Sequence, residues 1–101
     1  IDLSRLYWYC RLKDLLSYLE NRLVDPTIIL FGSLSKAEAK KGSDIDLSIF
    51  ANKKELNLQS FEKKLGRRIQ IFWFNSIKDI KNKELASSII NGYTLRGNLI
   101  F

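Results

Sequence analysis

Two carboxylates placed two residues apart are the strongest candidates for chemistry in this sequence. Asp44 and Asp46 lie in the run 43–50, where polar and aliphatic residues alternate as in a strand with one polar face. Both carboxylates should then point to the same side of a sheet. Like charges this close repel each other unless a cation lies between them. Oxygen ligands of this kind suit a hard cation such as magnesium, which takes one or two carboxylates together with substrate phosphates.

A glycine–serine pair at the end of an apolar run could complete a site for an anion. The run 27–31 is almost wholly apolar and leads directly into Gly32 and Ser33. Glycine lets the backbone approach a phosphate closely. Ser33 offers a hydroxyl and an amide at the start of a short helix, where exposed N–H groups and the dipole favour an anion. Lys36, one turn into that helix, could reach the same phosphate. In isolation, Ser33 is also explained as a helix cap and Asp44 as a turn residue.

Length and charge set the class of protein. The chain has 101 residues, which is enough for one domain with a single modest core. Its apolar fraction of 46% argues against disorder. The formal charge of +6 suggests an anionic partner, such as a nucleotide, a nucleic acid or an acidic protein surface. Lysines on solvated faces explain part of this excess.

Several classes of protein are excluded by composition. The chain has no histidine, so a zinc site or a histidine-based catalytic triad is excluded. The single cysteine, Cys10, cannot form an internal disulfide, which fits a reducing compartment and hence a cytoplasmic location. No apolar run reaches the roughly 18 residues of a membrane span, and no signal peptide is visible.

The elements that must position the candidate site alternate between helix and strand. A stripe of leucines at helical spacing indicates a first helix that ends before Asp25 and Pro26: Leu12, Leu15, Leu16, Leu19 and Leu23. Leu3, Leu6 and Cys10 extend this stripe upstream. The adjacent aromatic residues Tyr7, Trp8 and Tyr9 are explained equally well as core or as a partner surface.

Four strands and three further helical segments follow from the same patterns. We expect strands over 27–31, 45–51, 67–74 and 93–95, and helical segments over 35–41, from Asn52 to Gly66, and from Asn75 or Ser76 to Gly92. Alternation places Trp73 on the side of its strand opposite Phe72 and Phe74. The sequence therefore predicts a small α/β (α+β) domain with a mixed sheet flanked by helices, without a linker or internal repeat.

The spacing of the chemical residues carries a family resemblance. Gly32-Ser33, separated by ten residues from Asp44-Ile45-Asp46, resembles the signature of the DNA polymerase β-like nucleotidyltransferase superfamily. More closely, the chain is similar to the minimal nucleotidyltransferases, which often pair with a small helical HEPN protein as toxin and antitoxin. Lys36, Glu38, Ala39 and Ser43 also fall where that family has its basic, Glu-Ala and serine positions. The resemblance covers nearly all of residues 1–101, as a single domain.

The resemblance implies a nucleotide site and a reaction. Gly32, Ser33, Lys36 and Ser43 would bind the phosphates of a nucleoside triphosphate, with ATP expected. Asp44 and Asp46 would be catalytic and would hold Mg²⁺, which neutralises the leaving pyrophosphate. The reaction would transfer a nucleoside monophosphate to a hydroxyl. In relatives that pair with HEPN proteins, the acceptor is a tyrosine of the toxin.

One position departs from the family pattern. The family usually carries a third carboxylate on the next strand, and Gln70 occupies that place here. A glutamine side chain can accept a hydrogen bond, but it carries no charge and is no base. The exchange should therefore cost the chemical step more than it costs nucleotide binding.

Two functions remain open. The first is a magnesium-dependent nucleotidyltransferase, and the second is a nucleotidyltransferase-like antitoxin or regulatory subunit that no longer turns over. A nucleic-acid-binding domain rests on charge alone and is not favoured. A homodimer is possible because small domains gain buried area by pairing. Arg67 and Arg68 could contact phosphate, be solvated or bind an acidic partner, whereas Lys53-Lys54 and Lys63-Lys64 are expected on helix surfaces.

Overall fold

A four-stranded mixed sheet forms the centre of the domain. The computed structural model describes residues 3–35 and 42–99. The strands are β1 (Thr27–Phe31), β2 (Ile45–Phe50), β3 (Ile69–Phe74) and β4 (Tyr93–Arg96). Their spatial order is β3-β2-β1-β4, with β1 antiparallel to both β2 and β4, and β2 parallel to β3. This confirms the predicted mixed sheet.

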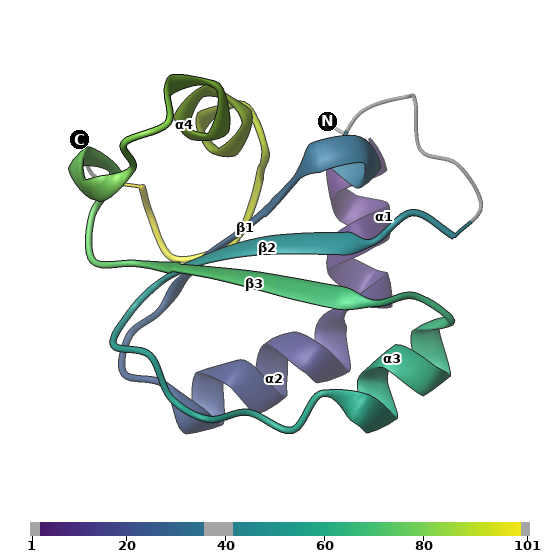
Figure 1. Ribbon diagram of the computed structural model, residues 1–101. Coiled ribbons are helices and arrows are strands. Elements are labelled where there is room, and N and C mark those ends of the chain that lie inside the picture. The colour runs from purple at the N-terminus through teal and green to yellow at the C-terminus, as the bar shows by residue number, and fades with distance from the viewer. Residues whose placement is uncertain (1–2, 36–41, 100–101) are drawn as a thin grey trace.

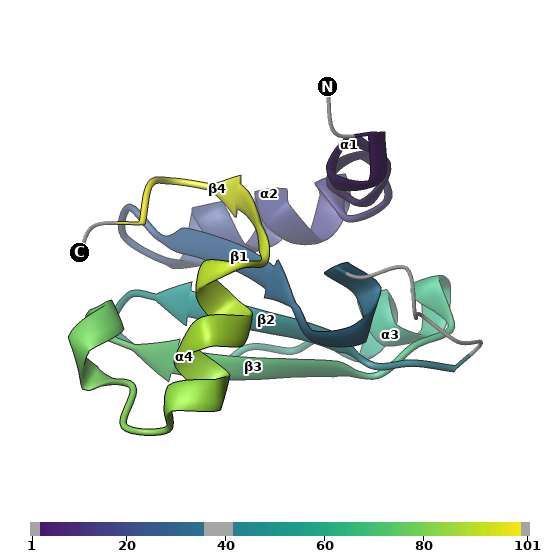
Figure 2. The same ribbon diagram turned by 90° about the horizontal axis from the view of Figure 1, so that it is seen from above.

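Helices cover both faces of the sheet. They are α1 (Leu3–Arg11), α2 (Lys13–Arg22), η1 (Gly32–Ser35), α3 (Gln59–Leu65), η2 (Ile77–Asp79) and α4 (Lys83–Ile90), where η marks a 3₁₀ helix. Helices α2 and α3 lie below the sheet in Figure 1, and α4 lies above it. Seen from above, β3 forms one outer edge of the sheet, and α1 lies at the upper right of the picture, beyond β1 (Figure 2). No helix among residues 3–35 and 42–99 is long and apolar enough to cross a membrane.

Strand alternation divides the core into two clusters. Ile45, Leu47 and Ile49 of β2 point towards α2 and belong to a cluster of buried leucines and isoleucines. The opposite face carries Ile29 and Phe31 of β1, which pack with residues of η2 and α4. The predicted alternation in β3 is confirmed, since its only tryptophan joins the first cluster and its phenylalanines join the second.

The leucine stripe is confirmed for α2 but wrong for α1. The five predicted leucines from 12 to 23 are all buried. By contrast, Leu3 is 72% and Leu6 is 51% exposed, and Cys10 is exposed as well. The chain leaves helical geometry at Leu12 (φ −99°, ψ 9°), so α1 and α2 have different axes. A stripe that is continuous in sequence therefore does not remain continuous in space.

The aromatic residues of α1 divide between the two roles that the sequence left open. Trp8 and Tyr9 pack against the first cluster, whereas Tyr7 is 55% exposed. The hydroxyl of Tyr9 accepts a hydrogen bond from Nη1 of Arg96 at 2.8 Å, which ties α1 to the last strand. The side of α1 that carries Trp8 and Tyr9 therefore faces the rest of the domain.

The helix predicted from Asn52 is shorter than expected. Residues 52–58 form no regular helix, and α3 begins at Gln59 without a side-chain cap. The backbone N–H of Asn57 donates to the hydroxyl of Tyr18 at 3.1 Å, and two leucines of this segment pack against the core. These tertiary contacts hold the segment outside a helix. The predicted end at Gly66 is confirmed, because this residue adopts the left-handed region at φ 68°.

The last predicted helix is also split in two. Ser76 caps η2 by accepting from the N–H of Lys78, and Asn82 caps α4 by accepting from the N–H of Leu85. Two capping side chains in one segment produce two separate starts.

The contrast between α1 and α2 gives a stability prediction. Leu16→Ala should lower the free energy of unfolding by about 2–5 kcal/mol, because it empties a fully buried position. Leu6→Ala, the same substitution on the outward side of α1, should change it by less than about 0.5 kcal/mol. Urea unfolding of both variants checks this. Equal losses would contradict the assignment of Leu6 to the surface.

Candidate functional site

The predicted site residues converge where β1 ends and β2 begins. In the sheet register Asp46 lies beside Phe31 on one side and beside Gln70 on the other. Gly32 follows Phe31 directly and opens η1. β2 runs antiparallel to β1, and β3 runs parallel to β2. This arrangement brings Gly32, Asp46 and Gln70 to one end of the sheet, on the face of the second cluster.

The contact between Gly32 and Asp46 is close enough to require glycine. Gly32 has φ +78°, and a Cβ built on it would lie 2.5 Å from Oδ2 of Asp46. A larger residue would strain the backbone and displace the carboxylate. The sequence suggested this glycine for its approach to phosphate, and the structure gives a second reason, which is its approach to Asp46.

Gln70 is hydrogen-bonded to the acidic pair. Its Nε2 donates to Oδ2 of Asp44 at 2.9 Å. Asp44 precedes the first residue of β2, but this bond shows that its carboxylate reaches the same side as Gln70. The amide thus holds one carboxylate oxygen in place and shields part of its charge.

The environment of Asp46 favours its neutral form. Burial, and secondarily the negative charge of Asp44, raise the pKa of Asp46 above its ordinary value of 3.8. Carboxylates near each other whose charge is poorly solvated are the arrangement in which a bound cation is most stabilising. A cation bound between the two carboxylates would offset both effects.

Asp46→Asn should stabilise the protein in the absence of divalent metal. The raised pKa means that the unfolded chain binds fewer protons than the folded one between the two pKa values, so wild-type stability falls as pH rises through this interval. Asparagine does not ionise, so the variant does not lose stability in this way as pH rises. Because the group is partly exposed, we expect a gain below about 1 kcal/mol near neutral pH. Thermal unfolding in EDTA measures it, and the difference should vanish near about pH 3. A lower melting temperature of the variant at neutral pH would contradict this account.

The serines and the lysine of the predicted phosphate site are placed unevenly. Ser33 is half-buried within η1, and Ser43 is half-buried just before the acidic pair. Lys36 lies outside the described residues, as does the rest of the predicted helical segment up to 41. Ser35, which sequence reasoning missed, donates its hydroxyl hydrogen to the carbonyl of Gly32 at 2.8 Å and so closes the turn after β1.

Arg67 has a different role from the one expected. It is half-buried, and its Nη1 donates to the carbonyl of Ser43 at 2.7 Å. Its guanidinium also lies 5.8 Å from the ring centre of Trp8. Arg67 precedes β3 and therefore connects that strand to Ser43, before the acidic pair, and to Trp8 of α1. The sequence carried no signal for this contact beyond the charge itself.

The donors present fit a hard divalent cation. Asp44 and Asp46 supply carboxylate oxygens, and Mg²⁺ takes few protein carboxylates because phosphate oxygens and water complete its shell. Within residues 3–35 and 42–99 no group of three or more His, Cys, Asp or Glu could hold a metal ion. The arrangement is thus suited to a cation that arrives with a phosphorylated substrate.

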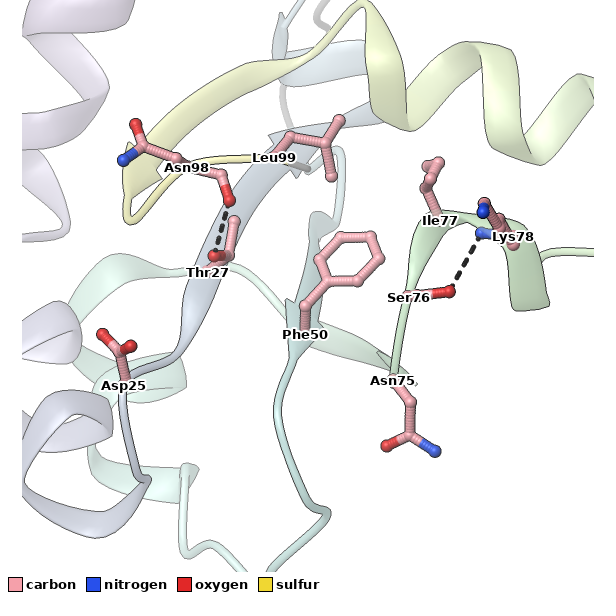
Figure 3. A pocket seen from close by; sticks show the side chains of 9 residues that line it. All are labelled: Asp25, Thr27, Phe50, Asn75, Ser76, Ile77, Lys78, Asn98 and Leu99. Carbon is pink, nitrogen blue, oxygen red and sulfur yellow. Dashed lines mark hydrogen bonds between the residues drawn. The ribbon is translucent and has the colours of Figure 1, made fainter. Parts of the chain in front are cut away.

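A separate hollow lies at the other end of the sheet. Its volume is about 420 Å³, and Thr27 and Phe50, which face each other in the register at the far ends of β1 and β2, line it. Figure 3 shows two hydrogen bonds made by its polar residues: Thr27 Oγ1 donates to the carbonyl of Asn98, and Ser76 Oγ accepts from the N–H of Lys78. It holds no carboxylate pair, so we place the candidate chemistry at Asp44 and Asp46.

Comparison with known proteins agrees with this geometry. The family model described as "Polymerase beta, Nucleotidyltransferase" matches residues 13–98. Among solved structures, a chain of the toxin–antitoxin MntA–HpeT, in a mutant with two aspartates changed to glutamate, superposes with a TM-score of 0.63 at 18% identity. The match covers 85% of this chain and 73% of that chain, and it establishes a shared fold. No curated protein matches significantly.

Proposed function

Because this chain belongs to the polymerase β nucleotidyltransferase family, we propose that it binds a nucleoside triphosphate with Mg²⁺ and transfers the nucleoside monophosphate to a hydroxyl. ATP, and hence AMP transfer, is the expected case. The observation that carries the proposal is the placement of Gly32, Asp46 and Gln70 at one end of the sheet, with Asp44 bonded to Gln70.

Each residue of the site has a proposed task. Gly32 and Ser33 bind the triphosphate through backbone amides and the serine hydroxyl, assisted by Ser43 and Lys36. Asp44 and Asp46 hold Mg²⁺, which would neutralise charge on the triphosphate and leaving pyrophosphate. The acceptor oxygen forms a bond to the α-phosphorus, the bond to pyrophosphate breaks, and the acceptor proton passes to solvent.

Removal of the acceptor proton is the step for which this chain lacks a catalytic base at position 70. Gln70 occupies the position where the family pattern has a third acid, and its amide already donates to Asp44. It can orient Asp44, but it cannot accept the acceptor's proton. This observation favours a second candidate function, in which the chain is a nucleotide-binding antitoxin or regulatory subunit with slow turnover or none.

The biological setting is proposed from the structural relative. That relative is part of a toxin–antitoxin pair, and we propose the antitoxin role for this chain, with a helical HEPN-type toxin as its partner. A tyrosine hydroxyl of that partner would be the acceptor. Such a pair would act in the cytoplasm, where ATP and Mg²⁺ are abundant.

Calorimetric titration with ATP tests the nucleotide site. We expect binding that requires Mg²⁺ and that weakens at least about tenfold in the variant carrying Asp44→Asn and Asp46→Asn, because both metal ligands lose their charge. A variant with Asp14→Asn and Asp25→Asn loses the same charge from exposed positions away from the site and should bind like wild type. No binding at millimolar ATP, or equal losses in both variants, would sink the proposal.

A further inference from the structure

A groove lies on the face of β3 opposite the acidic site. Ile69, Ile71 and Trp73 form its floor, and its volume is about 580 Å³. These residues alternate with Gln70 along the strand, so their side chains point away from Asp46. The groove is therefore separate from the proposed nucleotide site.

The rim of this groove is basic. Arg22, at the end of α2, and Lys53 and Lys54, in the non-helical segment after β2, line it together with a single acid, Glu55. The two lysines were expected on a helix surface, and the structure places them instead beside an apolar floor. Clustered positive charge next to half-buried aliphatic side chains is complementary to an acidic segment that carries an apolar side chain.

The aromatic rings of the groove are already engaged. The guanidinium of Arg22 lies 5.1 Å from the ring centre of Tyr18, and the ring of Phe61 lies 5.2 Å away. The hydroxyl of Tyr18 accepts from the backbone of Asn57, and Trp73 packs against the first cluster. Binding of single-stranded nucleic acid relies on aromatic faces on which bases stack. The engaged rings therefore favour a polypeptide occupant over a nucleic acid.

The strand that forms the floor is also an edge strand. β3 pairs with β2 on one side and stands at the end of the sheet (Figure 2). Its six residues, Ile69–Phe74, carry no charge, whereas edge strands are usually protected by charges, prolines or a covering element. The carboxylate of Glu62 accepts from the N–H of Ile69 at 2.8 Å, so a partner strand would pair from Ile71 onwards. An extended segment added along this edge could bond to the backbone while its side chains enter the groove.

We propose that this groove docks an extended acidic segment of a partner protein, with one apolar side chain seated on Ile71 and Trp73. Its carboxylates lie against Arg22, Lys53 and Lys54. This groove is distinct from the nucleotide site, and docking there does not depend on transfer chemistry. Because the rim charges are exposed, docking should weaken as salt rises.

A labelled peptide tests the proposal on the intact protein. The probe is fluorescein-labelled Glu-Asp-Glu-Leu-Phe-Glu-Asp-Glu, titrated by fluorescence anisotropy at low and high salt. Two matched peptides replace the apolar pair by serines or all acids by their amides. We expect both to bind at least about tenfold more weakly, because each loses one half of the complementarity. A thymidine dodecanucleotide serves as the nucleic-acid competitor.

A pair of charge-reversal variants locates the binding. Lys53→Glu with Lys54→Glu should lose at least about tenfold in peptide affinity. Lys81→Glu with Lys83→Glu makes the same change in net charge at exposed positions outside the groove and should retain it. Circular dichroism verifies folding, and ATP titration of the same samples should match wild type, which separates this test from that of the nucleotide site.

Three results would overturn the proposal. They are the absence of peptide binding at millimolar concentration, equal losses in the two variants, and tighter binding of the oligonucleotide that Lys53→Glu with Lys54→Glu abolishes. The last result would assign the groove to nucleic acid.

Discussion

Gln70→Glu should raise the rate of nucleotidyl transfer by about 10²- to 10⁴-fold, the usual contribution of a positioned general base. Glutamate has nearly the shape of glutamine, so the change adds a charge and a base with little change in packing. It lies beside Asp46 in the sheet register and would complete the set of three acids that the family pattern carries. The measurement is incorporation of label from α-labelled ATP into a candidate helical partner.

Gln70→Glu should lower the stability of the metal-free protein, although it should raise the transfer rate. The donated hydrogen bond from Nε2 to Asp44 is lost, and three carboxylates then lie close together. Repulsion should lower the melting temperature in EDTA, and Mg²⁺ should restore more stability to the variant than to wild type. Gln70→Leu, which removes the same hydrogen bond without adding charge, is the matched control and should gain no activity.

The outcome of this experiment distinguishes the two proposed functions. A gain in transfer would mean that the scaffold still aligns the acceptor and the triphosphate, and that the missing base alone limits turnover. Unchanged transfer with intact ATP binding would count against the enzyme and favour the non-catalytic antitoxin or regulatory subunit.

Gly32→Ala should destabilise the protein by about 1–3 kcal/mol and weaken binding of Mg²⁺ and ATP by at least about tenfold. Alanine is strained at φ +78°, and its Cβ would lie 2.5 Å from Oδ2 of Asp46. Relief of that contact moves either the carboxylate or the turn after β1. Both belong to the proposed site, so affinity and stability should fall together. Urea unfolding and ATP calorimetry measure the two effects.

Gly66→Ala provides the control for backbone strain. Gly66 has a similar φ of +68°, but a Cβ there would meet nothing within 4 Å among the described residues. This variant should lose stability through strain alone and bind ATP like wild type. If Gly32→Ala loses no more stability than Gly66→Ala and retains ATP binding, the contact with Asp46 has no functional role.

The sequence by itself determined the local features of this protein. Alternation in the run 43–50 placed the acids on the polar side of a strand, and the leucine spacing identified the buried side of α2. Gly66 marked the end of α3. These features depend on residues within a few positions of one another, where the periods of helix and strand are sufficient to assign a face.

The tertiary structure decided how these pieces meet. The bond from Gln70 to Asp44 spans 26 residues and that from Arg67 to Ser43 spans 24. Both depend on the parallel register of β2 and β3, which no local period specifies. The outward face of α1 and the groove beneath β3 also arise from contacts between residues that are far apart in the sequence. The break at Leu12 and the contacts of the segment 52–58 with the core override helical patterns that are sound in isolation, because packing between distant residues outweighs local propensity.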